Sequence, residues 1–417
     1  MSESTADDLA RPAHDPRAWP WREAIVDLLG RTRLAQPDQI ATAVNASTAR
    51  LGIDITVYLI DYEQRLLHPV PEPGKDVGGP LPVDATLAGR AFMTTAARAT
   101  GPSGAGGSPL WMPLLDGSER LGVLRIDAQD NAVVDTPEFQ AQCDMLAVLL
   151  GHLVAIKLQY GPHLDRTRRT RRMSAASELL WRLLPPLTYA CERFIVSAIF
   201  EPCYTAGGDG FDYAVDANTA FLAICDTTGH GLRAGMGTAA ALSAMRAARI
   251  DGDGLYQMAR AVDGAFAEQF TDGRFCTAVL MELDLDTGRV RYINAGHHPP
   301  VILRDGKVAA RLDAGRRLPL GLDDPQLTIG EVMLQPGDRI LAYTDGVTEA
   351  RDTGGKLFGE PRLLDLAARH TLAGRSAPET LRRLSHAVLS HLDGPPADDA
   401  TLLLAEWSVD TAAELTP

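Results

Sequence analysis

The feature that most constrains this sequence is an aspartate that recurs where predicted strands begin or end, in two places directly beside glycine. The C-terminal half holds six such residues, in the segments AGGDGFD, DTTGHG, TDGVTEA and PPADDAT: Asp209, Asp212, Asp226, Asp345, Asp398 and Asp399. Carboxylates at strand ends can meet on one rim of a sheet, where they repel one another strongly unless a counter-charge is present. We therefore expect these segments to meet at one edge of a β-rich domain around bound cations.

The chemistry of these side chains predicts hard divalent cations. The candidates are all carboxylates, and no His or Cys residues occur at zinc-ligand spacing. Oxygen ligands of this kind suit Mg²⁺ or Mn²⁺. Two such ions about 3.5–4 Å apart can acidify a water and hold a phosphoryl group for in-line attack. Each motif alone also fits an ordinary turn or strand start, so the prediction rests on their joint occurrence.

Hydrophobic patterning around the aspartates predicts alternating strands and helices. Strands are expected at 194–200, 219–225, 277–285, 289–294 and 338–343, with a last strand after PPADDAT. AGGDGFD is expected to be a loop, a helix is expected at 232–248, and two more helices are expected before PPADDAT. The predicted fold class is α+β.

The motifs GGDGFD, DTTGHG, NAGHHPP, TDGVTEA and DDAT, in this order, resemble the SpoIIE/RsbU-like branch of the PPM metal-dependent protein phosphatases, relatives of protein phosphatase 2C. The resemblance covers about 193–408, and ELLWRLLPPL before it is similar to the lead-in of many members. It implies an α-β-β-α sandwich of two antiparallel sheets with a dinuclear Mn²⁺ or Mg²⁺ site at one end.

The resemblance also implies roles for single residues. Asp226 would bridge both metals, the carbonyl of Thr227 would be a further ligand, and Asp345 and Asp398 would complete the metal side, with Asp399 the less favoured member of its pair. Asp209 would hold a metal or its water. Asp209 and Asp226 are the expected catalytic residues, and Asp212 would support them from outside the ligand set.

The sequence departs from the eukaryotic relatives at the expected proton donor. Their histidine two residues after the bridging aspartate is Thr228 here, and His230 follows two residues later. The proton donor therefore stays open. His297 and His298 lie in a glycine-proline loop, where a structural role is at least as well supported as a catalytic one. No arginine matches the residue that seats phosphate in the eukaryotic enzymes.

The resemblance implies a cytoplasmic bacterial protein-serine/threonine phosphatase that uses metal-activated water without a phosphoenzyme. Its substrate would be a phosphorylated regulatory protein, an anti-sigma-factor antagonist of the STAS type. The alternative is a catalytically inactive phosphatase-fold binding module in a partner-switching pathway. A nucleotide cyclase fits poorly, because GGD continues as GFD instead of the EF that cyclases require.

The N-terminal half is predicted to be a separate sensor domain. Its expected elements are helices at 21–33, from about 38, at 85–97 after the cap Asp84, and at 136–157, with strands at 53–59, 65–70, 110–115 and 121–126. This order resembles a GAF-type domain, with PAS as a neighbouring possibility. The predicted division is a tail at 1–20, the GAF-like domain at 21–160, a helical linker at 161–190, the phosphatase domain at 191–410 and a tail at 411–417.

An apolar seam in the last of these helices bears on oligomeric state. Its members are spaced by four, three, four and three residues: Phe139, Cys143, Leu146, Leu150 and Leu153. Such a seam can form a homodimer or pack on the domain's own sheet. The predicted oligomeric state is a homodimer through the linker helices. A second helix is expected to run to Leu184. The arginine-rich run at 166–172 is a solvated helix face or, as the sharper alternative, binds an acidic partner.

Charge and composition exclude several other classes. The formal net charge is −14, which disfavours binding to nucleic acid. The N-terminus lacks the pattern of a secretory signal, and the apolar stretch Met145–Leu158 is shorter than the roughly 18–20 residues that span a bilayer. The five cysteines form no CxxC pair and are expected to be reduced thiols.

Overall fold

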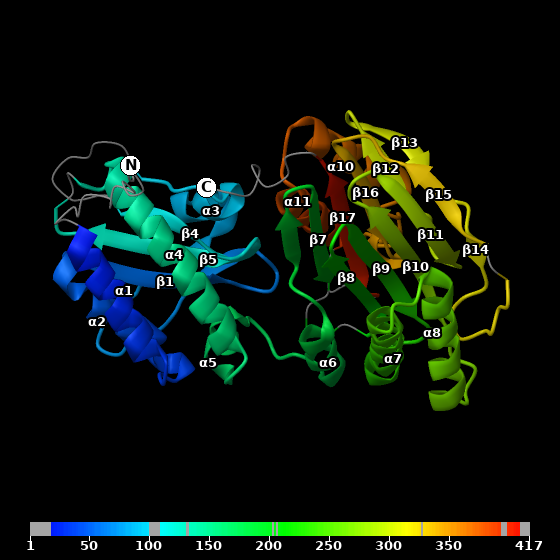
Figure 1. The fold of residues 1–417 in the computed structure, drawn as a ribbon, viewed down its shortest axis with the longest axis horizontal. Helices are drawn as coiled ribbons and strands as arrows, with labels where there is room; N and C mark the ends of the chain where they lie inside the picture. The colour runs from blue at the N-terminus through cyan, green and yellow to red at the C-terminus, as the bar shows by residue number, and fades with distance from the viewer. Residues whose placement is uncertain are drawn as a thin grey trace, which may run out of the picture. The chain divides into compact units, whose positions relative to one another are not determined.

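The structure is a computed structural model that describes residues 18–99, 109–130, 133–201, 204–205, 207–326, 328–392 and 398–408. It forms two compact units (Figure 1): unit 1 spans Met1–Ile60, Leu66–Asp116 and Leu121–Arg168, and unit 2 spans Asp61–Arg65, Gly117–Arg120 and Arg169–Pro417. The predicted loop at 100–108, most of both predicted tails and Cys203 lie outside the described residues. The four cysteines that are described are free, as expected for reduced thiols.

Unit 1 is built on a five-stranded sheet. Its strand order is β3-β2-β1-β5-β4, from β1 (Ile53–Ile60), β2 (Leu66–Pro69), β3 (Leu81–Pro82), β4 (Leu110–Asp116) and β5 (Glu119–Ala128). Its helices are α1 (Ala18–Thr32), α2 (Ile40–Thr48), α3 (Leu87–Thr94), α4 (Pro137–Leu158) and α5 (Pro162–Arg168). The predicted elements are therefore confirmed, while the GAF-type resemblance of this unit stays a prediction.

One local prediction in unit 1 needs correction. The strand β1 is where it was predicted and is buried on both faces, because Tyr58 and Ile60 pack with Phe92 of α3 while the alternate residues face the main core. The cap of α3 is not Asp84 but Thr86, whose hydroxyl accepts a hydrogen bond from the backbone N–H of Gly89 at 3.0 Å. The helix therefore starts two residues later than predicted.

The apolar seam of α4 packs inside unit 1. Cys143, Leu146 and Leu150 are buried, and Phe139 and Leu153 pack against the same core. A residue in this core cannot also form a seam with a second chain, so this seam does not support the predicted homodimer, which stays a prediction.

The same helix is long and apolar enough to cross a membrane by length and composition. Within unit 1 it makes polar contacts along its length: His152 Nδ1 lies 2.5 Å from Asp116, and Lys157 Nζ donates to the carbonyl of Ala35 at 2.6 Å. These contacts and its buried seam are typical of a core helix. The predicted absence of a membrane span stays a prediction.

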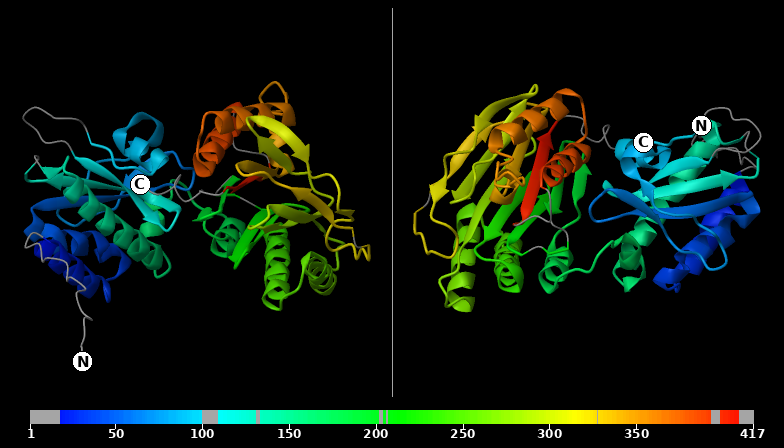
Figure 2. Two further views of the ribbon diagram at one scale, coloured as in Figure 1. Left: turned by 45° about the horizontal axis from the view of Figure 1, so that its top comes forward. Right: turned by 180° about the vertical axis from the view of Figure 1, so that it is seen from behind.

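Unit 2 is an α-β-β-α sandwich, as the fold prediction required. One sheet, here called the β9 sheet, has the order β14-β11-β10-β9-β8 with β15 paired to β11, and the other, the β17 sheet, has the order β13-β12-β16-β17-β7-β6. Helices α7 and α8 pack against the β9 sheet, and α10 and α11 lie on the outer side of the β17 sheet (Figures 1 and 2).

The strands and helices of unit 2 have the following bounds. The strands are β6 (Thr188–Cys191), β7 (Phe194–Glu201), β8 (Asp209–Asp216), β9 (Thr219–Thr227), β10 (Cys276–Asp284), β11 (Arg289–Ala295), β12 (Val301–Arg304), β13 (Lys307–Arg311), β14 (Arg316–Arg317), β15 (Gly330–Met333), β16 (Asp338–Tyr343) and β17 (Ala400–Trp407). The helices are α6 (Ala175–Leu183), α7 (Gly231–Ile250), α8 (Leu255–Gln269), α9 (Asp345–Thr348), α10 (Glu360–Leu372) and α11 (Ala377–His391).

Burial on both faces explains why β7 is mostly apolar, with Ser197 the one polar residue of its FIVSAIF segment. Ile195 and Ile199 face the core under α10 and α11, whereas Val196 and Ala198 face the core that the two sheets share. A strand covered on both faces is expected to read as a continuous apolar run. The sandwich is therefore encoded in the FIVSAIF segment itself.

Two further expectations, for the GGDGFD segment and for the linker helices, were wrong. The GGDGFD segment is not wholly a loop, since β8 begins at Asp209. The second helix expected up to Leu184 is broken into α5 and α6, and Ser174 caps α6 by accepting the N–H of Ser177 at 3.1 Å. Arg169 in the break pairs with Glu178 at 2.5 Å, so the arginine-rich run is not one continuous helix face.

The contact between α4 and β4 predicts opposite effects for two helix glycines of unit 1. A Cβ on Gly151 would lie 1.6 Å from the carbonyl oxygen of Leu115, whereas a Cβ on Gly30 of α1 would meet nothing within 4 Å. We expect Gly151→Ala to lower the free energy of unfolding by about 1–3 kcal/mol through overpacking. Gly30→Ala should raise it by about 0.5–1 kcal/mol. Chemical denaturation of the full chain tests both, and shifts of the same sign would contradict this packing.

Candidate active site

The β9 sheet brings two of the predicted aspartates side by side. Asp209 at the start of β8 is the direct register partner of Asp226 near the end of β9, and Asp226 is in turn the partner of Thr277 on β10. Directly opposed residues of antiparallel strands share a face, with Cβ atoms about 4.5–5.5 Å apart. Asp209, Asp226 and Thr277 therefore form a row across three neighbouring strands.

The β17 sheet presents the other aspartates at its own strand ends. Asp345 follows β16 as the first residue of α9, and Asp398 and Asp399 precede β17, the antiparallel neighbour of β16. The approach is close, because a Cβ on Gly346 would lie 1.9 Å from the carbonyl oxygen of Asp399. The glycine of the TDG motif is thus required by the meeting of these two segments.

The adjacent aspartates Asp398 and Asp399 have different environments. One carboxylate oxygen of Asp399 accepts the backbone N–H groups of Gly207 and Gly208 at 2.6 Å each and that of Asp209 at 3.3 Å. Asp398 accepts only the N–H of Asp399, at 2.9 Å, within the described part of the chain. Asp399 therefore holds the GGD segment in place, and Asp398 keeps oxygens available for a ligand.

A threonine that the sequence reasoning missed orients Asp209. Thr344 Oγ1 accepts the backbone N–H of Thr401 at 2.9 Å, so its single proton goes to the Asp209 carboxylate, 2.6 Å away. Thr344 is fully buried and Asp209 is 2% exposed. The available signal was a polar residue directly after the apolar strand DRILAY.

Glycine also clears the space beside Asp226 and Thr227. A Cβ on Gly208 would lie 2.5 Å from the carbonyl oxygen of Thr227 and 3.1 Å from a carboxylate oxygen of Asp226. Any larger residue at position 208 would displace both expected ligands. This is a physical reason for the second glycine of GGD.

The carboxylates act on one another electrostatically. Burial, followed by the charges of Asp345, Asp398 and Asp399, raises the pKa of Asp226 to about 7. Burial, followed by the charges of Asp226 and Asp399, raises the pKa of Asp209 well above its usual value. Burial is also the main cause that raises the pKa of Asp398. Such a cluster is stabilised by positive charge.

The donor chemistry at this edge fits divalent cations. Asp209, Asp226, Asp345 and Asp398 offer only carboxylate oxygen, which Mg²⁺ and Mn²⁺ prefer. Among the described residues, no three His, Cys, Asp or Glu side chains are gathered in a ready-made metal site. The fit therefore rests on the ligand type and on the mutual repulsion of the carboxylates.

Two other candidate residues have different placements. Asp212 does not join the cluster: its carboxylate pairs with Arg246 at 2.6 Å and Arg249 at 3.1 Å, both on α7. It therefore joins a strand to a helix. His230 is exposed at the start of α7, and its charge acts on Asp398.

Comparison with known proteins identifies relatives of this part of the chain. Residues 216–408 match the family model for stage II sporulation protein E (SpoIIE). This part of the chain belongs to the SpoIIE family. The matched range contains Asp226, Asp345 and Asp398, and Asp209 lies just before it. Below, unit 2 is called the SpoIIE unit.

Individual relatives resemble the SpoIIE unit. Protein IcfG of Synechocystis is 26% identical over 241 residues, covering 51% of this chain and 38% of that protein. Phosphoserine phosphatase RsbU of Bacillus subtilis is 25% identical over 219 residues, covering 52% and 64%. The chain thus spans less than two thirds of these relatives. A solved structure of the RsbU and RsbW domains of Rv1364c from Mycobacterium tuberculosis is 26% identical, covers 52% of this chain and 62% of that one, and has a TM-score of 0.46.

The different environments of Asp398 and Asp399 predict separable effects. Asp399→Ala should lower the free energy of unfolding by about 3 kcal/mol or more in metal-free protein, because three buried N–H groups lose their acceptor. Asp398→Ala removes a like charge and should leave metal-free stability unchanged or higher, while abolishing most of the stabilisation by Mn²⁺. Thermal denaturation with and without Mn²⁺ measures both. If Asp398→Ala lost the metal-free stability and Asp399→Ala lost the stabilisation by Mn²⁺, the structural and ligand roles of the two residues would have to be exchanged.

Proposed function

We propose that the SpoIIE unit is a Mn²⁺- or Mg²⁺-dependent protein-serine/threonine phosphatase of bacterial signalling. The observation that supports the proposal is the placement of the aspartates: Asp209 is the register partner of Asp226 on the β9 sheet, and Asp345 and Asp398 lie at the ends of neighbouring strands of the β17 sheet, where their charges help to raise the pKa of Asp226. The similarity to a relative named phosphoserine phosphatase supports the class of reaction.

The proposed cation ligands come from both sheets. Asp226 would bridge two ions, with the Thr227 carbonyl, Asp345 and Asp398 as further ligands and Asp209 holding an ion or its water. When bound, the ions supply Lewis-acid charge that stabilises a phosphoryl group and lowers the pKa of water.

The remaining chemistry belongs to residues around these ligands. Thr344 donates to one oxygen of Asp209 and so orients this carboxylate, which we propose faces an ion or its water. Asp399 holds the GGD backbone rigid through its three N–H bonds. His230 is exposed beside Asp398, and we propose it as the group that protonates the leaving oxygen, since imidazole is the commonest general acid in enzymes.

A cysteine nucleophile does not fit the site. Cys225 and Cys276 are buried, and their mutual hydrogen bond followed by burial raises the pKa of Cys225 well above its usual value. The nucleophilic form of cysteine is the thiolate, which such an environment suppresses. This supports hydrolysis by water without a phosphoenzyme.

The proposed substrate is a phosphorylated regulatory protein of the STAS type, in the cytoplasm, by analogy with RsbU. Unit 1 is proposed to regulate this activity, because the chain passes from it into the SpoIIE unit through α5 and α6. A homodimer is proposed as well, and light scattering of the full chain would measure it.

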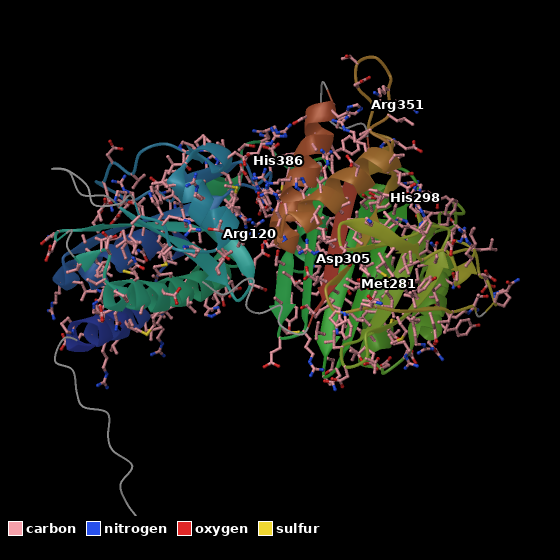
Figure 3. The ribbon with its side chains drawn as sticks, turned by 90° about the horizontal axis from the view of Figure 1, so that it is seen from above. Arg120, Met281, His298, Asp305, Arg351 and His386 are labelled. Atoms are coloured by element: carbon pink, nitrogen blue, oxygen red, sulfur yellow. The ribbon has the colours of Figure 1, made fainter. Side chains whose placement is uncertain are left out.

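Release of phosphate from a phosphoserine peptide by the full chain with Mn²⁺ tests the function. We expect Asp226→Asn to lower kcat/KM by at least about 100-fold, since it removes a charge from the proposed bridging position. The matched control is Asp305→Asn in the exposed turn between β12 and β13 (Figure 3), which should have no effect.

Two outcomes would contradict the proposal. Hydrolysis that survives both Asp226→Asn and chelation would exclude a mechanism dependent on these ions. Stoichiometric binding of the phosphoprotein without phosphate release, at saturating Mn²⁺, would favour the inactive binding module instead.

A further inference from the structure

His297 is a buried residue that the proposed mechanism does not use. It lies in the loop between β11 and β12 and is 7% exposed. Its backbone N–H donates to Asn294 at 2.9 Å, and its ring Nδ1 lies 2.9 Å from Thr277 Oγ1. Its Nε2 is buried without a hydrogen bond within the described residues. The ring thus has one side-chain hydrogen-bond partner, Thr277, and a further polar interaction with the backbone of Tyr343.

That contact reaches the row of aspartates. Thr277 is the register partner of Asp226, so the two side chains share one face of the β9 sheet. The glycine before His297 forms a bridge with the residue after Thr277, Gly296 with Ala278, which holds the loop against β10. His297 therefore contacts Thr277, the last residue of the row Asp209–Asp226–Thr277.

The direction of the hydrogen bond follows from the state of the ring. Burial, followed by the charge of His298, lowers the pKa of His297 to about 3, so the imidazole is neutral near pH 7. A neutral ring has one accepting nitrogen. With the ring proton on Nε2, Nδ1 is that acceptor, and the Thr277 hydroxyl, which has no other partner within the described residues, donates its proton to it.

We infer that His297 is a positioning residue that keeps the Thr277 hydroxyl proton away from Asp226 and so leaves both Asp226 oxygens open to a divalent cation. A threonine hydroxyl that lost this acceptor would turn to the neighbouring carboxylate, because hydrogen bonds to charged groups are the stronger ones. It would then compete with the cation. The inference rests on the proposed function, since it concerns the same cation site.

Mn²⁺ binding to the full chain, measured by calorimetry, tests the inference through a rescue. His297→Phe keeps a ring of similar size and should raise the Mn²⁺ dissociation constant about tenfold. Thr277→Val has no proton to donate and should bind Mn²⁺ about as well as the wild type. The double variant should bind like Thr277→Val, so the second substitution restores what the first removed.

The neighbouring histidine provides a matched control. His298, labelled in Figure 3, is exposed and stacks on Tyr343 with ring centroids 5.8 Å apart. His298→Phe should leave the dissociation constant unchanged. Melting temperatures without metal separate a general loss of stability from a change in cation binding, because a purely structural role of His297 would not be reversed by Thr277→Val.

The outcomes distinguish this inference from the proposed function. A double variant that binds Mn²⁺ as weakly as His297→Phe, or a His297→Phe variant that binds it normally, overturns the inference. In either case, Mn²⁺-dependent phosphate release by the wild type leaves the proposed function standing. A wild type that neither binds Mn²⁺ nor releases phosphate overturns both.

Discussion

The edge where the two sheets of the SpoIIE unit meet depends on one arrangement, in which the Asp399 carboxylate accepts three backbone N–H groups of the GGD segment. These bonds join chain segments about 190 residues apart. They hold Asp209 opposite Asp226 and within hydrogen-bond distance of Thr344. Burial raises the pKa of Asp399, and the three backbone donors oppose that shift. The hydrogen bonds that hold the GGD segment therefore also favour the charged form of this buried carboxylate.

Much of this edge could be predicted from sequence, because its ligands follow a local rule. Aspartate beside glycine at a strand end is visible in one segment at a time, and the order of the motifs adds specificity. Asp226, Asp345 and Asp398 all lie at strand ends, and the charges of Asp345 and Asp398 act on Asp226. Their exact roles as ligands stay proposals, since the roles depend on ions that the sequence does not contain.

What the sequence could not reveal depends on partners far along the chain. Asp399 and Thr344 look like the neighbours of ligands, and only the packing of the β17 sheet against the β9 sheet shows what they hold. Asp212 was misleading for the opposite reason. It lies three residues from Asp209, yet it pairs with Arg246 and Arg249 on the helix that covers the sheet.

The aspartates of the cluster differ in burial, so one end of this edge is more accessible to solvent than the other. Asp209 is buried, Asp226 and Asp345 are half-buried, and Asp398 is exposed, as is His230 beside it. Desolvation penalises charge most at the buried end, where Thr344 supplies a hydrogen bond. At the exposed end, solvent can supply the hydrogen bond until a ligand binds. The edge therefore opens toward Asp398 and His230, and a phosphorylated side chain approaching from there would meet the candidate acid and the least buried carboxylate first.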